Sequence, residues 1–533
     1  MNNSMIRMIV AGAAALVTTT VVAPRAEAFC GFYVSGGGAK MFNDATQVVL
    51  MRDGTRTVLS MQNDYNGPIA DFAMVVPVPV VLKEADVKTL PRSVFDHVDS
   101  LGAPRLVEYW ERDPCQVEYP RKMSMRGDML QPSAAMDVGG APSSHGVKIE
   151  AKFAVGEYQI LILSATEATG LETWLRDNKY QIPKDAAPLL RPYIEAGSKF
   201  FVAKVDPKKV TFDGNRAALS PLRFSYDHDE FSLPIRLGMA NSSGTQDLIV
   251  NVIAADKRFE VANYKNVTIP TNFDVKDGVK SRFGEFYAAL FDKTAQRNPG
   301  AVITEYSWAA TPGGMCDPCP PESTLVTPAD LALLGGDVVG GAIARGSFVL
   351  TRMHARYGKA DMKDDLRFRE ASPIVGGREF RNSNGKLEYG SSSSSVNNFQ
   401  ARYAMRHWWT GPMTCKNPRR GIWGGPWNYE EQSDDMIMAR KIAFVPRGKV
   451  SLPMLVKRDL PEIGVRQWRA KPKLIAPSTV PGAEKPAPTT PTTPAKPPAK
   501  PPAKPMNLGF AALLLLTSLG AAHRFARRDQ KGA

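Results

Sequence analysis

The sequence predicts an α+β fold, strand-rich with a few helices, that continues into a proline-rich stalk and a single C-terminal transmembrane helix. Short apolar runs rich in β-branched residues recur between Gly, Pro and Asn, whereas few windows have helical spacing. The 533 residues are 43% hydrophobic and 23% charged, which excludes a collagen-like, wholly disordered or polytopic membrane protein. One uncharged apolar stretch near the C-terminus is compatible with a single membrane span.

The first strands form a predicted hairpin. Residues 46–51 and 55–61 have strand character, and Asp53-Gly54 between them is a typical hairpin turn. A third strand begins at 72–76, and Pro77 and Pro79 predict that its far end is an edge or a loop.

The remaining elements follow from the same patterns. Further strands are predicted at 158–164, 200–205, 247–254 and 347–357, and helices at 170–178, 184–196 and 279–296. Thr327-Pro328-Ala329-Asp330 combines an N-cap, a proline at the first helical position and an acidic first turn, so a short helix begins there. Residues 122–146 and 390–395 are predicted to be flexible loops.

The N-terminus has the pattern of a signal peptide. Arg7 precedes an apolar run of small residues, and Ala26-Glu27-Ala28 supplies the small side chains of a cleavage site. We predict that residues 1–28 are removed after Ala28. The bulky Phe29 directly before Cys30 argues against a lipoprotein signal.

The C-terminus has the pattern of a tether. A Pro-rich linker at 477–505 precedes an uncharged apolar helix at 506–522, and a basic tail follows at 523–533. The basic cluster places that tail in the cytoplasm and the large part of the chain outside. The same pattern resembles bacterial sorting signals that a protease removes, so retention and cleavage both stay open. The folded part then comprises 29–320 and 321–476.

The net charge of +14 does not predict a nucleic-acid partner. Eight basic and two acidic residues lie between 477 and 533, and two basic and one acidic residue lie in 1–28. The folded part therefore carries only +7, diluted over its whole length.

The five cysteines all lie in the part predicted to be outside the cytoplasm, where disulfides are favoured. Five cysteines form at most two bridges, in fifteen arrangements that the sequence does not distinguish. The CxxC spacing of two of them also suits half a zinc site, with distant ligands such as Cys415 or His354, or a redox pair. The disulfide candidates are Cys30, Cys115, Cys316, Cys319 and Cys415.

Catalytic motifs are absent from the sequence. It contains no HExxH, GxSxG, Walker-type loop or GxGxxG. The run Asp227-His228-Asp229-Glu230 has the residue types for a divalent cation or for acid/base chemistry, but charged clusters between strands are usually solvated turns. His97 and His354 fit structural roles. We expect no catalytic residue, no metal and no cofactor.

Four of the eight tryptophans fall within twenty residues, beside Arg419-Arg420. Aromatic faces stack on sugar rings and arginine recognises carboxylates, so this cluster predicts a weak ligand site for a cell-wall glycan or peptide. The alternative is a tryptophan-rich loop packed on the fold. The cluster consists of Trp408, Trp409, Trp423 and Trp427.

Ordered sequence blocks resemble the DUF2330 family of bacterial exported proteins. The blocks include FAMVVPVPVVL at 72–82, WAATPGGMCDPCPP at 308–321, FVLTRMHARYGKADMKDDLRF at 348–368 and FQARYAMRHWWTGPMTC at 399–415. The resemblance covers about residues 29–416. The family has no assigned activity, so the resemblance implies a signal-bearing protein, often with a C-terminal membrane segment, and no catalytic residue.

These observations together predict an exported envelope or surface protein, anchored by one C-terminal span, with a noncatalytic binding or structural role. The expected partners are the membrane, through the C-terminal helix, and a cell-wall glycan or envelope protein. An exported hydrolase or metal-dependent enzyme is the alternative.

Overall fold

The computed structural model describes residues 32–35, 42–66, 72–115, 147–178, 180, 182, 186–213, 216–241, 245–311, 318–358, 362–378, 387–424 and 436–469, which belong to one compact unit. Within these ranges no helix is both long enough and apolar enough to cross a membrane. The predicted signal peptide, the 122–146 loop, the linker, the apolar helix at 506–522 and the basic tail lie outside the described residues.

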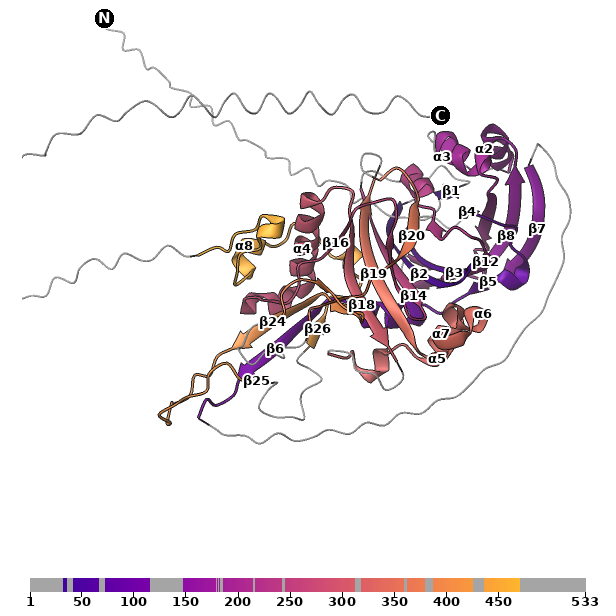
Figure 1. Cartoon of the computed structure of the whole chain (residues 1–533). Coiled ribbons are helices and arrows are strands. Elements are labelled where there is room, and N and C mark those ends of the chain that lie inside the picture. The colour runs from indigo at the N-terminus through magenta and orange to yellow at the C-terminus, as the bar shows by residue number, and fades with distance from the viewer. Residues whose placement is uncertain are drawn as a thin grey trace, which may run out of the picture. The chain divides into compact units, whose positions relative to one another are not determined.

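A large mixed sheet forms the centre of the described part (Figure 1). Its strand order is β22-β21-β23-β18-β19-β14-β2-β3-β12-β5, and β16 pairs with β18. The strands are β2 (Phe42–Asp53), β3 (Arg56–Asn66), β5 (Val87–Thr89), β12 (Leu222–Asp227), β14 (Gln246–Ala254), β16 (Asn266–Thr268), β18 (Val302–Ala310), β19 (Phe348–Tyr357), β21 (Ile374–Gly376), β22 (Ser392–Ser393) and β23 (Asn398–Gln400).

The predicted hairpin is confirmed as β2 and β3. Asp53 pairs with Arg56 across a turn in which Gly54 has a φ of 54°, a conformation that glycine adopts without a steric penalty. β14 then lies parallel to β2 and antiparallel to β19, so segments far apart in the sequence meet at the middle of the sheet.

A second sheet, in the order β1-β4-β9-β8-β7, is antiparallel throughout. In the described residues β1 pairs with β4 from Phe72 to Val75, and Pro77 pairs with Phe200 of β9. The residues before Phe32, which would continue β1 towards Pro77, lie outside the described residues. The strands are β1 (Phe32–Ser35), β4 (Phe72–Val78), β7 (Val147–Val155), β8 (Tyr158–Ala165) and β9 (Lys199–Val205).

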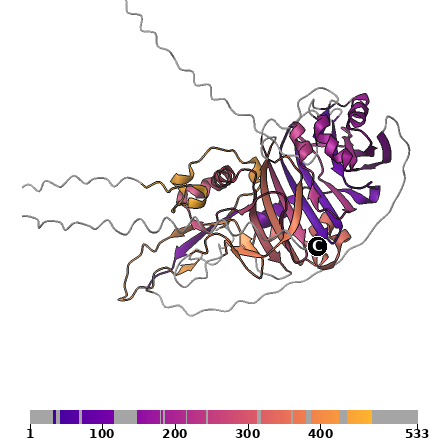
Figure 2. The same cartoon turned by 45° about the horizontal axis from the view of Figure 1, so that its top comes forward.

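The two sheets pack face to face and helices cover their outer faces (Figures 1 and 2). Val48, Val250, Ile160 and Phe201 lie in the core between the sheets. On the second sheet the cover is α2 (Ala168–Asp177) and α3 (Ala186–Glu195). On the large sheet it is α1 (Ser93–Gly102), α5 (Pro328–Leu331), α6 (Asp337–Val339) and α7 (Gly341–Ala344). The predicted α+β class is thus confirmed, with four layers in the order helix, sheet, sheet, helix.

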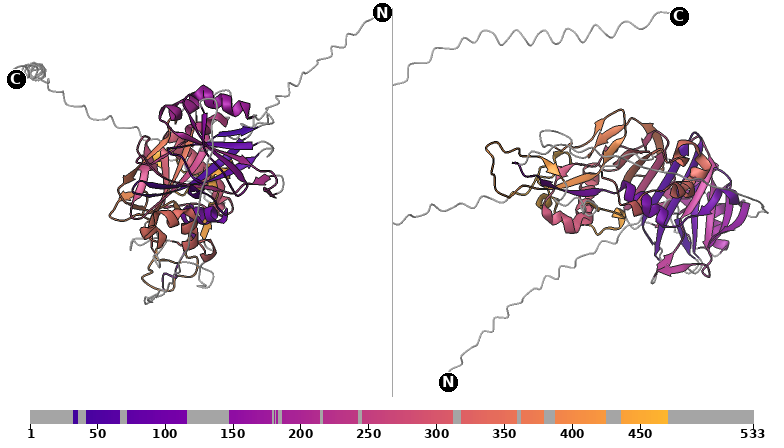
Figure 3. Two further views of the ribbon diagram at one scale, coloured as in Figure 1. Left: turned by 90° about the vertical axis from the view of Figure 1, so that its right-hand side faces the viewer. Right: turned by 90° about the horizontal axis from the view of Figure 1, so that it is seen from below.

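A third sheet, which we call the arm, projects from the large sheet (Figure 3). Its order is β17-β24-β6-β25, with β26 also paired to β6, and the apolar stripe of α4 packs on it. The elements are β6 (Arg105–Glu111), β17 (Phe273–Asp274), α4 (Phe283–Arg297), β24 (Arg402–His407), β25 (Trp423–Gly424), β26 (Met436–Met438) and α8 (Leu452–Leu455). Two smaller sheets comprise β13 (Ser232–Leu233), β20 (Leu366–Ala371) and β15 (Arg258–Val261), and β10 (Thr211–Asp213) with β11 (Arg216–Ala218).

The predicted strands and helices all occur, with three differences. The helix predicted from 279 begins at Phe283, because residues 277–282 form a 3-10 turn. Residues 392–393 of a predicted loop pair as β22. β6, β7, β12, β18, β20, β24, α1 and the shorter strands were not predicted. The short helix at Pro328 is confirmed: Thr327 Oγ1 accepts a hydrogen bond from the Asp330 N–H at 3.1 Å.

Candidate functional site

Three members of the predicted tryptophan cluster, Trp408, Trp409 and Trp423, follow β24 or lie in β25, at the free end of the arm (Figure 1). β24 ends at His407, and the chain returns through residues 408–422, which we call the arm loop, to β25. β25 pairs with the end of β6 through Trp423 and Glu111. The arm loop therefore joins two strands that flank β6 on opposite sides.

A disulfide fastens the arm loop to the end of β6. Cys115 and Cys415 are bonded, with their Cα atoms 5.4 Å apart, and the Arg419 N–H donates to the Pro114 carbonyl at 2.8 Å. Cys319 is disulfide-bonded too. These bonds confirm the disulfide prediction for three cysteines, and Cys30 and Cys316 lie outside the described residues. The suggestion of Cys415 as a zinc ligand is wrong, because its sulfur is bonded to Cys115.

One buried carboxylate organises the arm loop from within. Glu111 is fully buried, and its two oxygens accept hydrogen bonds from the Trp409 N–H at 3.0 Å and the Gly421 N–H at 2.7 Å. Arg420 pairs with the same carboxylate at 3.0 Å. Both ends of the loop are thus held to one side chain, so the surface that the loop presents is preorganised.

Trp408 and Trp423 form the aromatic surface of the arm loop. Their rings meet edge to face with centroids 4.7 Å apart, and Trp408 is 55% exposed. The Arg420 guanidinium lies 5.5 Å from the Trp408 centroid, and that of Arg406 lies 5.0 Å from Trp423. Both guanidiniums are paired within the protein, Arg420 with Glu111 and Arg406 with Asp274, so the feature that the arm loop offers to a sugar ring is the exposed aromatic ring itself.

The other two tryptophans of the predicted cluster do not join this surface. Trp409 is half-buried and packs on Gly411, where an added Cβ would lie 2.4 Å from the Trp409 ring. Trp427 lies outside the described residues. Two other apolar side chains of the arm loop are exposed, Met413 at 45% and Ile422 at 44%.

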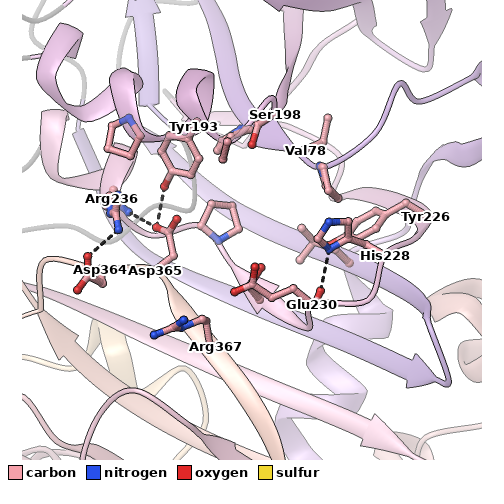
Figure 4. A pocket seen from close by; sticks show the side chains of 17 residues that line it. Val78, Tyr193, Ser198, Tyr226, His228, Glu230, Arg236, Asp364, Asp365 and Arg367 are labelled. Carbon is pink, nitrogen blue, oxygen red and sulfur yellow. Dashed lines mark hydrogen bonds and ion pairs between the residues drawn. The ribbon is translucent and has the colours of Figure 1, made fainter.

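The acidic run at 227–230 does not converge on one point. Asp227 pairs with Arg56 at 3.0 Å, whereas His228 and Glu230 line a cleft of about 490 Å³ (Figure 4). Within the described ranges no group of three or more His, Cys, Asp or Glu side chains is placed to hold a metal ion.

A cluster of buried charges, which no sequence pattern indicated, joins α1 to strands β18 and β19 of the large sheet. Arg352 is fully buried between Asp99 at 2.6 Å and Glu305 at 2.8 Å, and His354 Nδ1 lies 2.9 Å from the other Glu305 oxygen. The structural roles predicted for the histidines are confirmed, because His97 likewise pairs with Asp330 at 2.9 Å.

The buried charges set each other's protonation. Burial alone would raise the pKa of Glu305, but His354 and Arg352 outweigh it and hold the pKa at about 2. Asp247 is affected in the same way. Burial would raise its pKa, but the neighbouring His354, Arg447 and Arg356 outweigh this and lower it. Glu305, Arg352 and His354 are all fully buried, so no substrate reaches them. We therefore interpret this cluster of charges as a structural element.

The comparisons with known proteins identify a family and nothing closer. Residues 24–369 match a family model described as "Uncharacterized protein conserved in bacteria (DUF2330)". The matched range ends before the arm loop, short of residue 416 where the sequence resemblance was expected to end. No curated protein and no solved structure matches the chain.

Proposed function

This chain belongs to the DUF2330 family of bacterial proteins, and on that premise we propose that it is an exported, membrane-tethered envelope protein whose arm loop binds cell-wall glycan. The observation that carries the proposal is Trp408, a tryptophan left 55% exposed on a loop that a disulfide and a buried carboxylate hold in place. Exposed aromatic residues on rigid supports are typical of binding surfaces.

Two further observations support export. Disulfides form in oxidising compartments, and Cys115, Cys319 and Cys415 are all bonded. The N-terminal 28 residues have the charge, apolar run and small cleavage residues of a signal peptide. The Pro-rich linker and the apolar helix at 506–522 supply the tether.

Trp408→Ala is expected to weaken the binding of the purified full chain to insoluble cell-wall material about thirtyfold. Truncating a central aromatic residue of a binding surface costs about 2 kcal/mol. The measurement is the bound fraction as a function of wall concentration. Trp468→Ala is the matched control, because Trp468 is 50% exposed but lies on Lys276 outside the arm loop. Equal binding by the Trp408 and Trp468 variants would refute the arm loop as the glycan site.

Protein recovered from membranes of cells that produce the full chain is expected to begin at Phe29. A signal peptidase that cleaves after Ala28 leaves this new terminus, which N-terminal sequencing or intact mass reads directly. The Ala28→Lys variant, which places a large charged side chain at the cleavage position, should keep the uncleaved segment. Recovery of the unmodified protein with Met1 still attached would contradict the export proposal.

A further inference from the structure

The described part of the chain contains a second candidate site, well away from the arm loop in sequence and in the fold. A cleft of about 490 Å³ opens where the end of β4, the end of α3 and the β13–β20 pair meet (Figure 4). This volume falls within the range of about 300–1,000 Å³ that small-molecule sites occupy.

The cleft lining is mixed, and its polar part is somewhat larger than its apolar part. The apolar part comes mainly from four prolines of separate segments: Pro77, Pro79, Pro192 and Pro234. Proline has a fixed φ and no N–H, so these residues offer no backbone donor to a ligand. Leu59 and Val78 also line the cleft. This apolar part can receive an apolar group of a ligand.

The charged groups on one side of the cleft are engaged within the protein. Arg236 pairs with Asp364 at 2.6 Å, and Asp365 Oδ1 accepts hydrogen bonds from the Tyr193 hydroxyl at 2.6 Å and the Ile235 N–H at 2.8 Å. Burial raises the pKa of Asp365. These contacts hold α3 and β20 together.

The opposite side carries two unpaired charges of opposite sign. Arg367 lies directly across from Ser232 in the β13–β20 pair, and Glu230 precedes Ser232 by two residues, just before β13 begins. All three line the cleft. Within the described ranges, neither the Arg367 guanidinium nor the Glu230 carboxylate forms an ion pair or a hydrogen bond.

We propose that this cleft binds a small zwitterion with apolar side chains, a free amino acid or short peptide, whose carboxylate pairs with Arg367 and whose ammonium pairs with Glu230. The two charges have opposite signs and line the same cleft, so they match the two ends of such a ligand and favour it over a ligand with a single charge. The proline walls receive its side chains. The proposal does not depend on glycan binding by the arm loop.

The test is calorimetric titration of the purified full chain with the dipeptide Leu-Leu, its N-acetyl form and its C-terminal amide. Leu-Leu is expected to bind at least about tenfold more tightly than either blocked form, because each block removes one charge-assisted contact. Arg367→Gln should weaken Leu-Leu about tenfold but leave the amide unchanged. Glu230→Gln should weaken Leu-Leu about tenfold but leave the N-acetyl form unchanged.

Control variants separate these outcomes from misfolding and from the arm loop. Arg369→Gln removes an arginine two residues further along β20 that pairs with Glu260 outside the cleft, and it should leave all three affinities unchanged. Trp408→Ala should also leave them unchanged. The proposal is overturned if Leu-Leu shows no saturable binding, if the blocked forms bind as well as Leu-Leu, or if the Arg367, Glu230 and Arg369 variants bind alike.

Discussion

Glu305→Gln is expected to lower the free energy of unfolding by about 3–5 kcal/mol, the cost of leaving a buried charge without its partner. The substitution removes the negative charge that faces Arg352 Nε at 2.8 Å and His354 Nδ1 at 2.9 Å, while all three side chains stay fully buried. Denaturant unfolding monitored by circular dichroism measures the loss.

The matched control is Glu370→Gln, which breaks an exposed pair with Lys257. Both side chains of that pair are at least half exposed, and exposed pairs contribute about 0–1 kcal/mol. If Glu305→Gln is as stable as Glu370→Gln, the buried charge of Glu305 does not stabilise the folded state and the prediction is wrong.

In the same variant, the free energy of unfolding should also fall less steeply as the pH is lowered into the acid range. The folded-state pKa of Glu305 is about 2, below its ordinary value of 4.5, so its contribution is complete above the unfolded-state pKa and is lost as pH falls through about 2. In the unmodified protein stability therefore drops between about pH 5 and pH 2. In Glu305→Gln, unfolding takes up as much as one proton less in that window, so the free energy of unfolding depends less steeply on pH. An unchanged pH dependence would contradict the low pKa of Glu305.

Replacing Cys115 and Cys415 together by serine is expected to cost about 2–4 kcal/mol, because the bridge closes a chain segment of 300 residues and restricts the unfolded state. Both cysteines are replaced at once so that neither is left as an unpaired thiol that could mispair. The free energy of unfolding, measured with and without reductant, gives the effect. Reductant should destabilise the unmodified protein more than the double variant, and equal losses would contradict the role of this bridge.

The double variant also separates stability from binding. The arm loop would still be held by Glu111, but only through hydrogen bonds and the Arg420 ion pair. Cell-wall binding should therefore weaken by less than in Trp408→Ala, which removes the exposed ring itself.

Local pattern was sufficient for the capped helix and for several strands. The turn at Asp53-Gly54 and the capping residues of α5 are local signals, and both occur as predicted. β14 and β19 were predicted too, although both are buried along almost their whole length. β6, β18 and β24 were not predicted, and each has a buried charged side chain within its apolar run, Arg105, Glu305 and Arg402 respectively.

The candidate site was predictable only in part. The density of tryptophans pointed to the arm loop, and Trp408 does lie exposed there. The groups that shape it, Glu111 and Cys115, stand about 300 residues earlier in the chain, and no local pattern links such distant residues. The cleft is equally nonlocal, since Arg367 and Glu230 become neighbours only through the β13–β20 pair.

The parallel pairing of β6 with β24 has a kinetic consequence. β6 is complete at Glu111, yet the strand beside it begins only at Arg402. A chain synthesised from its N-terminus therefore presents β6 without this neighbour, and the Cys115 thiol without its partner, until nearly all of the folded part has emerged. The arm is expected to be the last region to assemble, and a thiol-disulfide isomerase is the folding factor on which its yield should depend most.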